Sequence, residues 1–368
     1  MTELLKYQIA LSLVKGIGPK LARNLVAYVG EVEEVFKQSE RSLSKIPGIG
    51  SVVAKSIKSA DVLERAEEEI EFILQHQIQP LFFTSPEFPS RLNYCDDAPL
   101  MIFLKGQNKL DSRKVIGIVG TRQSSEDAKI NCEKLVSGLA VNYPDLVIVS
   151  GLAYGIDVCA HQSALKNSVA TYGVLAHGLD RIYPSLHRNT AAQMIGQGGL
   201  ITEFLTKTNP DKPNFVRRNR IVAGLVDALI VVESGIKGGA VITARIASSY
   251  NRDVLAFPGC VNNEMAKGCN YLIKSNIAGL VEDAQDVANA LGWEVDKNHN
   301  SVQKKIFNEF NNSEEELLYT LLYNNKEMTA NELSLASNLP VSKVSANMLS
   351  LEFAGMVKSL PGNAFRLL

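Results

Sequence analysis

The sequence predicts an α/β protein with three folded parts: an all-helical N-terminal domain (1–80), a doubly wound, largely parallel sheet (81–295) and a C-terminal winged helix (313–368). Three observations lead to this prediction. Short β-branched runs alternate with helical stretches in the central part. A glycine-rich turn occurs twice in the first part, and three helical stretches precede a hairpin pattern at the end. Residues 296–312 are rich in Asn, Lys and Ser and are predicted to form a linker.

The composition limits the classes of protein to which the chain can belong. Its 368 residues exceed the usual size of one hydrophobic core, and 46% apolar with 21% charged residues is typical of a soluble, folded protein. A net charge of −1 excludes a generally basic coat, so any affinity for nucleic acid must come from a local patch or from backbone amides. The sequence shows no signal peptide and no run of about 18 apolar residues, and it has no Cys-x-x-Cys pair. We therefore expect a cytoplasmic protein without a membrane span.

A Gly-Ile-Gly turn is repeated in the first domain. Gly16-Ile17-Gly18-Pro19 recurs as Pro47-Gly48-Ile49-Gly50, and each copy precedes a helix start. The pair resembles a tandem helix-hairpin-helix domain, in which glycine permits positive φ and the next helix offers free N–H groups to a DNA phosphate. Lys20, Arg23 and Lys55 could add positive charge there. The glycines could equally be simple helix caps in a small bundle, and the sequence does not decide between the two.

Strands and helices alternate through the central domain. Helices are expected between the strands, among them Glu126–Val141, started by Ser124 or Ser125, and Asp157–Leu165, capped by Asp157. This alternation predicts helices on both faces of the sheet. The predicted strands are Val115–Val119, Leu146–Val149, Thr171–Leu175, Leu200–Phe204, Ala228–Glu233 and Val254–Phe257, with Gly279–Val281 as a short last strand.

The last part of the chain has the pattern of a winged helix. Helices are predicted at Ser313–Leu322, at Ala330–Ser337 after a Thr329 cap, and at Ser342–Phe353. Residues 356–367 then predict a hairpin with Pro-Gly-Asn at its turn. The third helix carries Lys343 as its sole cation and also Glu352, so reading of a DNA major groove is not expected. Contact with a protein is the favoured role, and a simple solvated surface is the alternative.

Small and polar residues follow the predicted strands. Ligands of open parallel sheets bind beyond the carboxyl ends of the strands, so these segments should crowd one rim and offer backbone amides and helix N-termini to an anion. The segments are Val119-Gly120-Thr121-Arg122, Ser150 to Asp157, His177 to Asp180, Thr202-Glu203, Glu233-Ser234 with Gly238-Gly239-Ala240, and Pro258-Gly259.

Positive charge gathers beside this rim. Arg122 follows a strand and is placed to meet a phosphate with its planar donor fork. Arg218 and Arg220 are expected on a loop-to-helix junction that faces the same rim, and Phe215 offers a face on which an unpaired base can stack. Taken singly, Arg122 could instead pair with Glu203 or Asp157, and Phe215 could belong to the core.

The cations between Leu205 and Arg220, taken together, favour binding of an anionic ligand. The five cations of this segment stand against the single anion Asp211. Such an excess over so short a length, beside an aromatic side chain, favours an anionic ligand over a purely structural role. The five cations are Lys207, Lys212, Arg217, Arg218 and Arg220.

Together these motifs resemble the DprA family, also called Smf, over the whole central domain, and the flanking domains resemble those of its longer members. The resemblance implies an extended Rossmann fold that forms a homodimer. It also implies a protein that binds and protects single-stranded DNA and loads RecA onto it during natural transformation and homologous recombination, with single-strand binding protein as a further partner. The motifs are Val119-Gly120-Thr121-Arg122, Ser150 to Asp157 with Ala160-His161, Gly178-Leu179-Asp180-x-x-Tyr183-Pro184, Phe215-x-x-Arg218-Asn219-Arg220, Gly238-Gly239-Ala240-x-x-Thr243-Ala244 and Pro258-Gly259.

The residue arguments and the resemblance together predict one DNA-binding site. Two positions depart from the family pattern: Val216 stands where proline commonly follows the phenylalanine, and Asp127 stands near a common glycine. Neither change removes a cation. The predicted site consists of Gly120, Thr121, Arg122, Ser150, Gly151, Lys207, Lys212, Phe215, Arg217, Arg218, Asn219, Arg220, Gly238 and Gly239.

No metal, cofactor or catalytic nucleophile is predicted. His161 is expected to hold a helix or a neighbouring loop by hydrogen bonds, and His177 and His187 lack a third ligand at metal spacing. Ser150 and Ser234 lack the Gly-x-Ser-x-Gly elbow of hydrolases. We therefore expect a binding protein and not an enzyme.

Two alternatives stay open. A nucleotide-processing enzyme of the phosphoribohydrolase type would share this Rossmann variant. However, Arg245 stands where that family has its catalytic glutamate, and neither Gly-x-Gly-x-x-Gly after the first strand nor a Walker A pattern occurs. The second alternative is a DNA-repair scaffold whose central pocket is vestigial and whose flanking domains carry the function.

Overall fold

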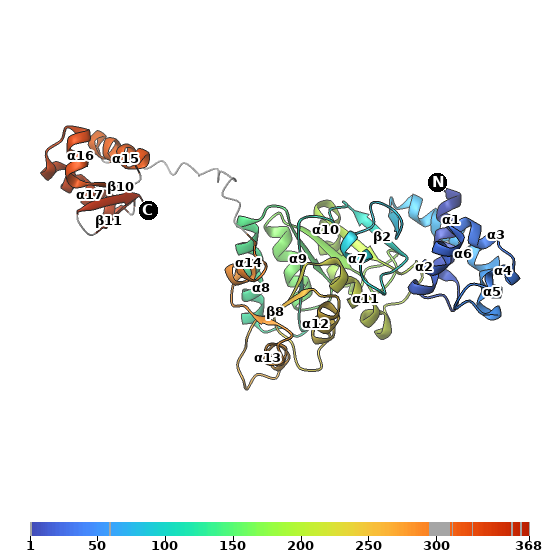
Figure 1. The fold of residues 1–368 in the computed structure, drawn as a ribbon. Coiled ribbons are helices and arrows are strands. Elements are labelled where there is room, and N and C mark those ends of the chain that lie inside the picture. Colours follow the sequence, from blue (N-terminus) through green and yellow to red (C-terminus); the bar gives the residue numbers. More distant parts are fainter. Residues whose placement is uncertain are drawn as a thin grey trace. The chain divides into compact units, whose positions relative to one another are not determined.

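The computed structural model describes residues 2–58, 60–293, 310, 312–325, 327–354, 356–360 and 363–367. The chain divides into two compact units, Met1–Asp296 and Lys297–Leu368, which Figure 1 colours along the sequence. Apart from Phe310 and Asn312, the predicted linker at 296–312 lies outside the described residues. No helix in the described part of the chain is long and apolar enough to cross a membrane.

Helices alone form the beginning of the larger unit. The two Gly-Ile-Gly turns precede α2 and α5, and Gly16 and Gly48 have φ values of 87° and 85°, which glycine adopts without strain. Each turn packs on the helix that follows the other, since Gly16 lies against Val53 and Gly48 against Leu21. The helices are α1 (Thr2–Leu13), α2 (Pro19–Val29), α3 (Val32–Lys37), α4 (Glu40–Leu43), α5 (Ser51–Ile57) and α6 (Ala60–Gln75).

A single sheet with the strand order β1-β2-β6-β5-β4-β3-β7-β8-β9 forms the centre of the larger unit. Strands β3 to β9 are parallel, and β1 and β2 extend the β6 edge in antiparallel fashion. The order reverses at β3, which lies between β4 and β7 and so marks the switch point where doubly wound sheets bind ligands. The strands are β1 (Gln79–Phe82), β2 (Met101–Gly106), β3 (Lys114–Val119), β4 (Leu146–Ser150), β5 (Ala170–Val174), β6 (Gly199–Thr202), β7 (Ala228–Val231), β8 (Asp253–Ala256) and β9 (Gly279–Leu280).

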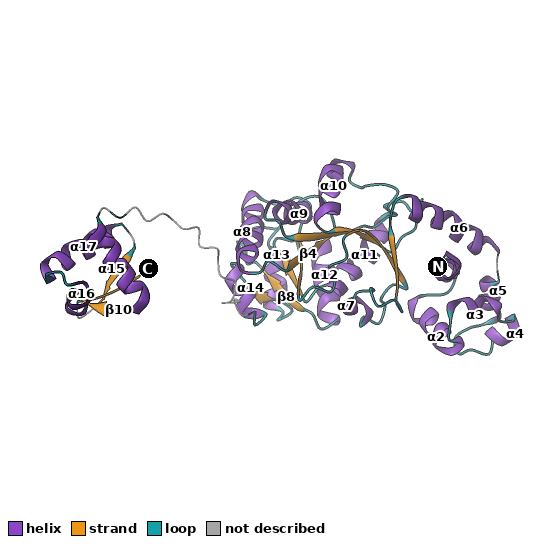
Figure 2. Ribbon diagram, turned by 90° about the horizontal axis from the view of Figure 1, so that it is seen from above, coloured by secondary structure: helices purple, strands orange, loops and turns teal. Residues whose placement is uncertain are grey.

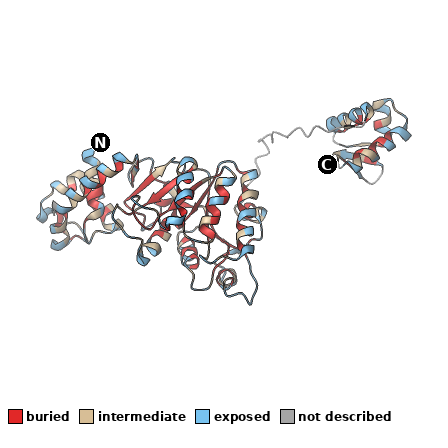
Figure 3. Ribbon diagram, turned by 180° about the vertical axis from the view of Figure 1, so that it is seen from behind, coloured by how far each residue is buried: buried red, intermediate tan, exposed pale blue. Residues whose placement is uncertain are grey.

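Helices cover both faces of this sheet, as Figure 2 shows. Val115 and Val119 of β3 pack in the core beneath α11 and α12, whereas Ile116 and Ile118 pack beneath α8 and α9. The central strands β3 to β7 therefore bury both faces, which is the reason for their largely apolar sequences and for their burial in Figure 3. The helices are α7 (Ser90–Asn93), α8 (Glu126–Asn142), α9 (Ile156–Lys166), α10 (Arg188–Gln197), α11 (Lys212–Leu225), α12 (Gly239–Ser249), α13 (Lys267–Lys274) and α14 (Ala284–Ala290).

The parallel strands and the cap of α8 were predicted from the sequence, but not every detail was. Ser125 caps α8 by accepting a hydrogen bond from Ala128 N at 3.2 Å, which selects one of the two predicted serines. The prediction that Asp157 caps α9 is wrong. Gly155, with φ 76°, precedes the helix, and Asp157 lies buried in its first turn, where Ala153 N donates to it at 3.4 Å. Strands β1 and β2 were not predicted.

The helical domain packs on the antiparallel edge of the sheet. One apolar core contains Ile9 and Leu11 of α1 together with Phe82 of β1 and Met101 of β2. Arg23, which could have served DNA binding, lies at this contact instead: its guanidinium donates to Asn93 Oδ1 at 2.9 Å and lies 4.4 Å from the centre of the Phe83 ring. Burial lowers its pKa. Lys20 and Lys55 remain exposed.

The smaller unit is a winged helix, as predicted. Thr329 and Glu332 form a capping box at α16. The cation of α17, Lys343, is paired with Glu314 of α15 at 2.8 Å. Pro361 and Gly362 of the predicted turn lie outside the described residues. The elements are α15 (Ser313–Asn325), β10 (Glu327–Thr329), α16 (Ala330–Ser337), α17 (Val341–Phe353), β11 (Val357–Leu360) and β12 (Ala364–Leu367), and β10, which pairs with β12, was not predicted.

Candidate functional site

The loop that follows β3 is held rigidly at the switch point. Thr121 N donates to the carbonyl of Glu233, two residues after the end of β7, at 2.7 Å. The buried Glu233 carboxylate accepts hydrogen bonds from Ser125 N at 2.8 Å and from Ser125 Oγ at 2.9 Å. A side chain at Gly120 would overlap Ile156, so only glycine fits this close approach. These contacts fix the backbone from which Arg122 extends.

Arg122 lies beside two aromatic rings at this rim. Its side chain is exposed, and its guanidinium carbon is 5.1 Å from the ring centre of Phe215 on α11. The Tyr183 ring follows at 5.9 Å from that of Phe215, and 45% of Tyr183 is exposed. The predicted neighbourhood of Arg122 and Phe215 is therefore present. Glu203 is paired with Arg217 and Arg220, and Asp157 accepts from Ala153 N, so neither carboxylate is the partner of Arg122.

Arg218 does not reach the surface, which corrects its expected position. The helix begins at Lys212, so Arg218 and Arg220 lie inside α11 and not at a loop-to-helix junction. Arg218 is 4% exposed, and its Nη1 donates to the carbonyl of Gly151 at 2.6 Å and to that of Val174. Burial lowers the pKa of Arg218 to about 10, although the nearby Asp157 opposes the shift. The guanidinium thus joins the carboxyl ends of β4 and β5.

Ser150 and Gly151 support this arrangement from below the surface. Ser150 is fully buried, and its Oγ donates to the carbonyl of Ile118 at 2.5 Å. A side chain at Gly151 would overlap the guanidinium of Arg218, which explains the glycine there. Both residues were predicted to contact DNA directly. Their burial leaves them to hold the strand ends instead.

Glu203 forms ion pairs with the other two arginines of α11. Its Oε2 accepts from Arg217 at 3.0 Å and from Arg220, whose second nitrogen donates to the carbonyl of Asp97. Arg220 is 9% exposed, whereas 56% of the Arg217 side chain is exposed above the Phe204 ring. Burial raises the pKa of Glu203, and the two guanidinium groups counteract this shift. Of these two arginines, only Arg217 presents its side chain to solvent.

The remaining predicted residues lie around α11 and α12. Lys212 is exposed at the first turn of α11, and Asn219 is half-buried. Lys207 is exposed but paired at 2.8 Å with Glu68 of α6. Gly238 caps α12 and Gly239 opens it, so the N–H groups at the start of an 11-residue helix lie next to the switch point.

Three residues near the rim were missed by the sequence reasoning. Tyr183 follows β5 within a recognised motif, and its aromatic type next to small residues was the available signal. Lys237 is exposed directly before the cap of α12. Glu69 of α6 accepts hydrogen bonds from Thr206 N at 3.1 Å and Thr206 Oγ1 at 2.7 Å. This contact joins segments far apart in the sequence, so no local pattern could reveal it.

The three buried histidines of the central domain have structural partners, as expected for His161. Thr171 Oγ1 donates to the carbonyl of Ile148 at 3.1 Å, so it accepts the proton of His161 Nδ1 at 2.7 Å. Burial and the neighbouring Arg218 lower the pKa of His161 to about 3. His177 and His187 each contact a backbone carbonyl, those of Gly178 and Leu152. No group of three metal-ligating side chains occurs within the described ranges.

A doubly wound sheet with an arginine–aromatic rim, tandem glycine turns before it and a winged helix after it define a DNA-processing protein of Rossmann type. Models of known families agree. The family described as DNA recombination-mediator protein A matches residues 79–292, the SAM-like helix-hairpin-helix tandem matches 9–60, and the DprA winged helix domain matches 312–363. The chain belongs to the DprA/Smf family, as its motifs indicated.

Named relatives support this assignment. Protein Smf of Synechocystis sp. is 34% identical over 292 residues, covering 77% of this chain and 71% of that protein. The X-ray structure of DNA processing protein A from Streptococcus pneumoniae superposes with a TM-score of 0.68 at 30% identity, over 77% of this chain and 97% of the other. The structure of DNA processing protein A from Helicobacter pylori, described by its single-stranded DNA binding mode, gives 0.53 at 28% identity over 58% and 95%.

Proposed function

We propose that this protein binds single-stranded DNA at the rim formed by Arg122, Phe215, Tyr183 and the start of α12. The main support is the position of the exposed Arg122 side chain. Its guanidinium carbon lies 5.1 Å from the centre of the Phe215 ring, and the Tyr183 ring packs next to Phe215. A guanidinium binds a phosphate in any base sequence, and an aromatic ring stacks on any unpaired base. The relative from Helicobacter pylori, which is described by its single-stranded DNA binding mode, supports the proposal.

The predicted site separates into two groups under this proposal. Arg122, Phe215, Lys212 and Arg217 are accessible enough to contact the strand. The buried residues would support these contacts indirectly. Arg218 and Ser150 hold the ends of the strands by hydrogen bonds to backbone carbonyls, and Gly151 leaves room for the Arg218 guanidinium. Arg220 orients Glu203 by an ion pair. Gly120, Thr121, Gly238 and Gly239 supply backbone next to the phosphate path, and Lys207 and Asn219 lie at its border.

A mobility-shift experiment with an all-thymine oligonucleotide tests binding. Arg122→Ala should weaken binding clearly, and Arg113→Ala is the matched control. Arg113 is also exposed but lies before β3, at the opposite edge of the sheet. Equal affinities of the two variants would contradict the proposed surface.

We further propose that the protein passes the strand to RecA, including strands coated by single-strand binding protein. Binding through phosphates and ring faces leaves base edges free for a later pairing search, which is what a RecA loader requires. We also propose a homodimer formed through the Rossmann domain and place it in the cytoplasm, where five free cysteines stay reduced. Strand exchange with varied order of addition tests the loading role; no stimulation over RecA alone would refute it.

The alternative enzyme is disfavoured by one side chain. Arg245 of α12, which stands at the position of the phosphoribohydrolase glutamate, is exposed and donates to Tyr271 Oη at 3.0 Å. A guanidinium cannot act as the general base of that reaction at neutral pH. Hydrolysis of a nucleoside monophosphate by purified protein would overturn this conclusion.

A further inference from the structure

A buried histidine holds the backbone of Tyr183 at the rim. The N–H of Tyr183 donates to Nε2 of His177 at 3.2 Å, across six residues of the loop that follows β5. His177 is 1% exposed, whereas Tyr183 is largely exposed and its ring packs beside that of Phe215. This hydrogen bond therefore fixes the point from which the tyrosine ring extends.

The two partners of the imidazole determine its protonation state. Nδ1 of His177 lies 2.8 Å from the carbonyl oxygen of Gly178, which can only accept, so Nδ1 carries a proton. Nε2 faces the N–H of Tyr183, which can only donate, so Nε2 carries none. The neutral ring satisfies both contacts. A protonated ring would direct its Nε2–H at the N–H of Tyr183 and break this hydrogen bond.

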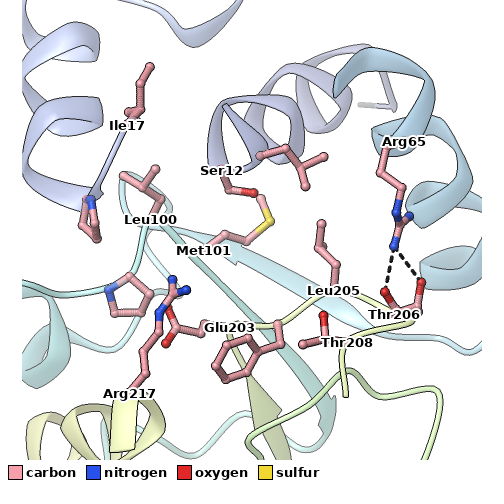
Figure 4. A pocket seen from close by; sticks show the side chains of 14 residues that line it. Ser12, Ile17, Arg65, Leu100, Met101, Glu203, Leu205, Thr206, Thr208 and Arg217 are labelled. Atoms are coloured by element: carbon pink, nitrogen blue, oxygen red, sulfur yellow. Dashed lines mark hydrogen bonds and ion pairs between the residues drawn. The ribbon is translucent and has the colours of Figure 1, made fainter. Parts of the chain in front are cut away.

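The backbone that carries the imidazole is fixed from the neighbouring strand. Thr202, at the end of β6, is buried, and its Oγ1 donates to the carbonyl of His177 at 2.8 Å. A side chain at Gly178 would overlap the backbone of the segment that follows β6. That segment is bound to α6, because Arg65 Nη2 donates to the carbonyl and to Oγ1 of Thr206 at 2.9 Å each (Figure 4). The imidazole therefore has a rigid support.

The surroundings keep the imidazole neutral at neutral pH. Burial lowers the pKa of His177 below its ordinary value of 6.5, and the nearby carboxylate of Asp180 and guanidinium of Arg181 shift this pKa in opposite directions. These two groups are paired with each other at 2.8 Å. Lys207, whose N–H donates to Asp180 at 3.3 Å, has its amino group paired with Glu68. The ring thus takes up a proton only as the pH falls below 6.5.

We propose that His177 is a positioning residue for DNA binding: its neutral imidazole holds Tyr183 where the tyrosine ring stacks on an unpaired base, and protonation releases Tyr183. The inference rests on the proposed binding of single strands at the rim and adds a residue that acts through Tyr183. His177 itself is too deeply buried to contact the strand. An imidazole in this position differs from an amide, because protonation converts its acceptor nitrogen into a donor.

The first test separates stacking from phosphate binding. Affinities of the full chain for an all-thymine oligonucleotide are measured by fluorescence anisotropy. Tyr183→Ala should bind about fivefold more weakly or worse, as the loss of one stacked base implies. His177→Leu removes the acceptor and should also weaken binding, with the slope of log K against log salt unchanged because no phosphate contact is lost. His177→Gln should restore most of the affinity, since its side-chain carbonyl can accept from Tyr183 N.

The double variant His177→Leu/Tyr183→Ala shows whether the histidine acts through the tyrosine. It should bind no more weakly than Tyr183→Ala alone, because no ring is left to position. Losses that multiply would overturn the inference, as would wild-type affinity of a folded His177→Leu variant. Either result leaves the proposed function intact, provided that the wild type binds the strand. Failure of the wild type to bind would overturn both.

The pH dependence gives a test that does not require the leucine variant to fold. Thymine keeps its protonation state between about pH 7.5 and about pH 5, and the wild type should lose affinity relative to His177→Gln below pH 6.5. His76→Gln is the matched control, because His76 contacts the carbonyl of Phe72 at 3.0 Å within the helical domain. This control should keep the wild-type profile. Parallel profiles of the wild type and His177→Gln would overturn the inference.

Discussion

Replacing Arg122 by alanine removes one exposed donor and leaves the buried contacts of the rim in place. Each phosphate contact with a single strand contributes about 0.7 to the slope of log K against log salt. Raising salt from about 50 to about 200 mM changes log salt by roughly 0.6, so the wild type should lose about 2.6-fold more affinity than the variant does. The variant should also be weaker at every salt concentration.

Arg218→Ala should have a different signature, because this arginine is 4% exposed. Its loss leaves the carbonyls of Gly151 and Val174 without their donor and Asp157 without its nearby positive charge. Breaking such a buried interaction costs about 3–5 kcal/mol of unfolding free energy. The salt slope of the molecules that remain folded should stay unchanged, because no phosphate contact is lost.

The assay joins anisotropy titrations at several salt concentrations with urea unfolding. Trp293, the single tryptophan of the chain, packs on Tyr143 in the core of the larger unit and reports its unfolding by fluorescence. Arg113→Ala is the control for both measurements. A reduced slope for Arg218→Ala at wild-type stability would refute this division of roles and restore the phosphate contact that the sequence predicted.

Three further predictions concern the surroundings of the site. The pKa of His161, about 3 in the fold against 6.5 as the ordinary value, makes the unfolded chain take up the proton first. Stability therefore falls as pH drops from 6.5 towards 3, by roughly 2.7 kcal/mol at pH 4.5, and urea titrations should show this loss missing in His161→Leu. Glu69→Ala should accelerate hydrogen exchange of the Thr206 amide at least tenfold, as mass spectrometry can measure, and protection equal to wild type would contradict the contact. A chain ending at residue 296 should retain single-strand binding in a mobility shift, because Lys343 of the winged helix is already paired with Glu314.

The parallel strands could be predicted because burial on both faces selects continuous β-branched runs, as in Val115–Val119. The edge strands could not. Gln79–Phe82 contains a proline, and Met101–Gly106 has a single β-branched residue, so their pairing comes from the packing of the helical domain against them. Contacts with the helical domain stabilise β1 and β2, and such contacts between distant segments cannot be seen in a local sequence pattern.

The site was predicted by residue type more accurately than by exposure. Arg122 and Phe215 lie together as expected. The sequence could not show that Arg218 points inwards, because its acceptors follow two different strands and its direction depends on the exact start of α11. The sequence around an arginine in a basic segment is the same whether its guanidinium binds a phosphate or donates to two backbone carbonyls.

The contact between the helical domain and the sheet edge also constrains how this family can change by loss or gain of domains. Phe82, Met101 and Phe103 belong to the central domain by sequence, yet they are buried by α1 and its neighbours. A descendant that lost the helical domain would expose an apolar edge prone to sticking to other chains. Family members that lack the helical domain should therefore carry polar or charged residues at these three positions.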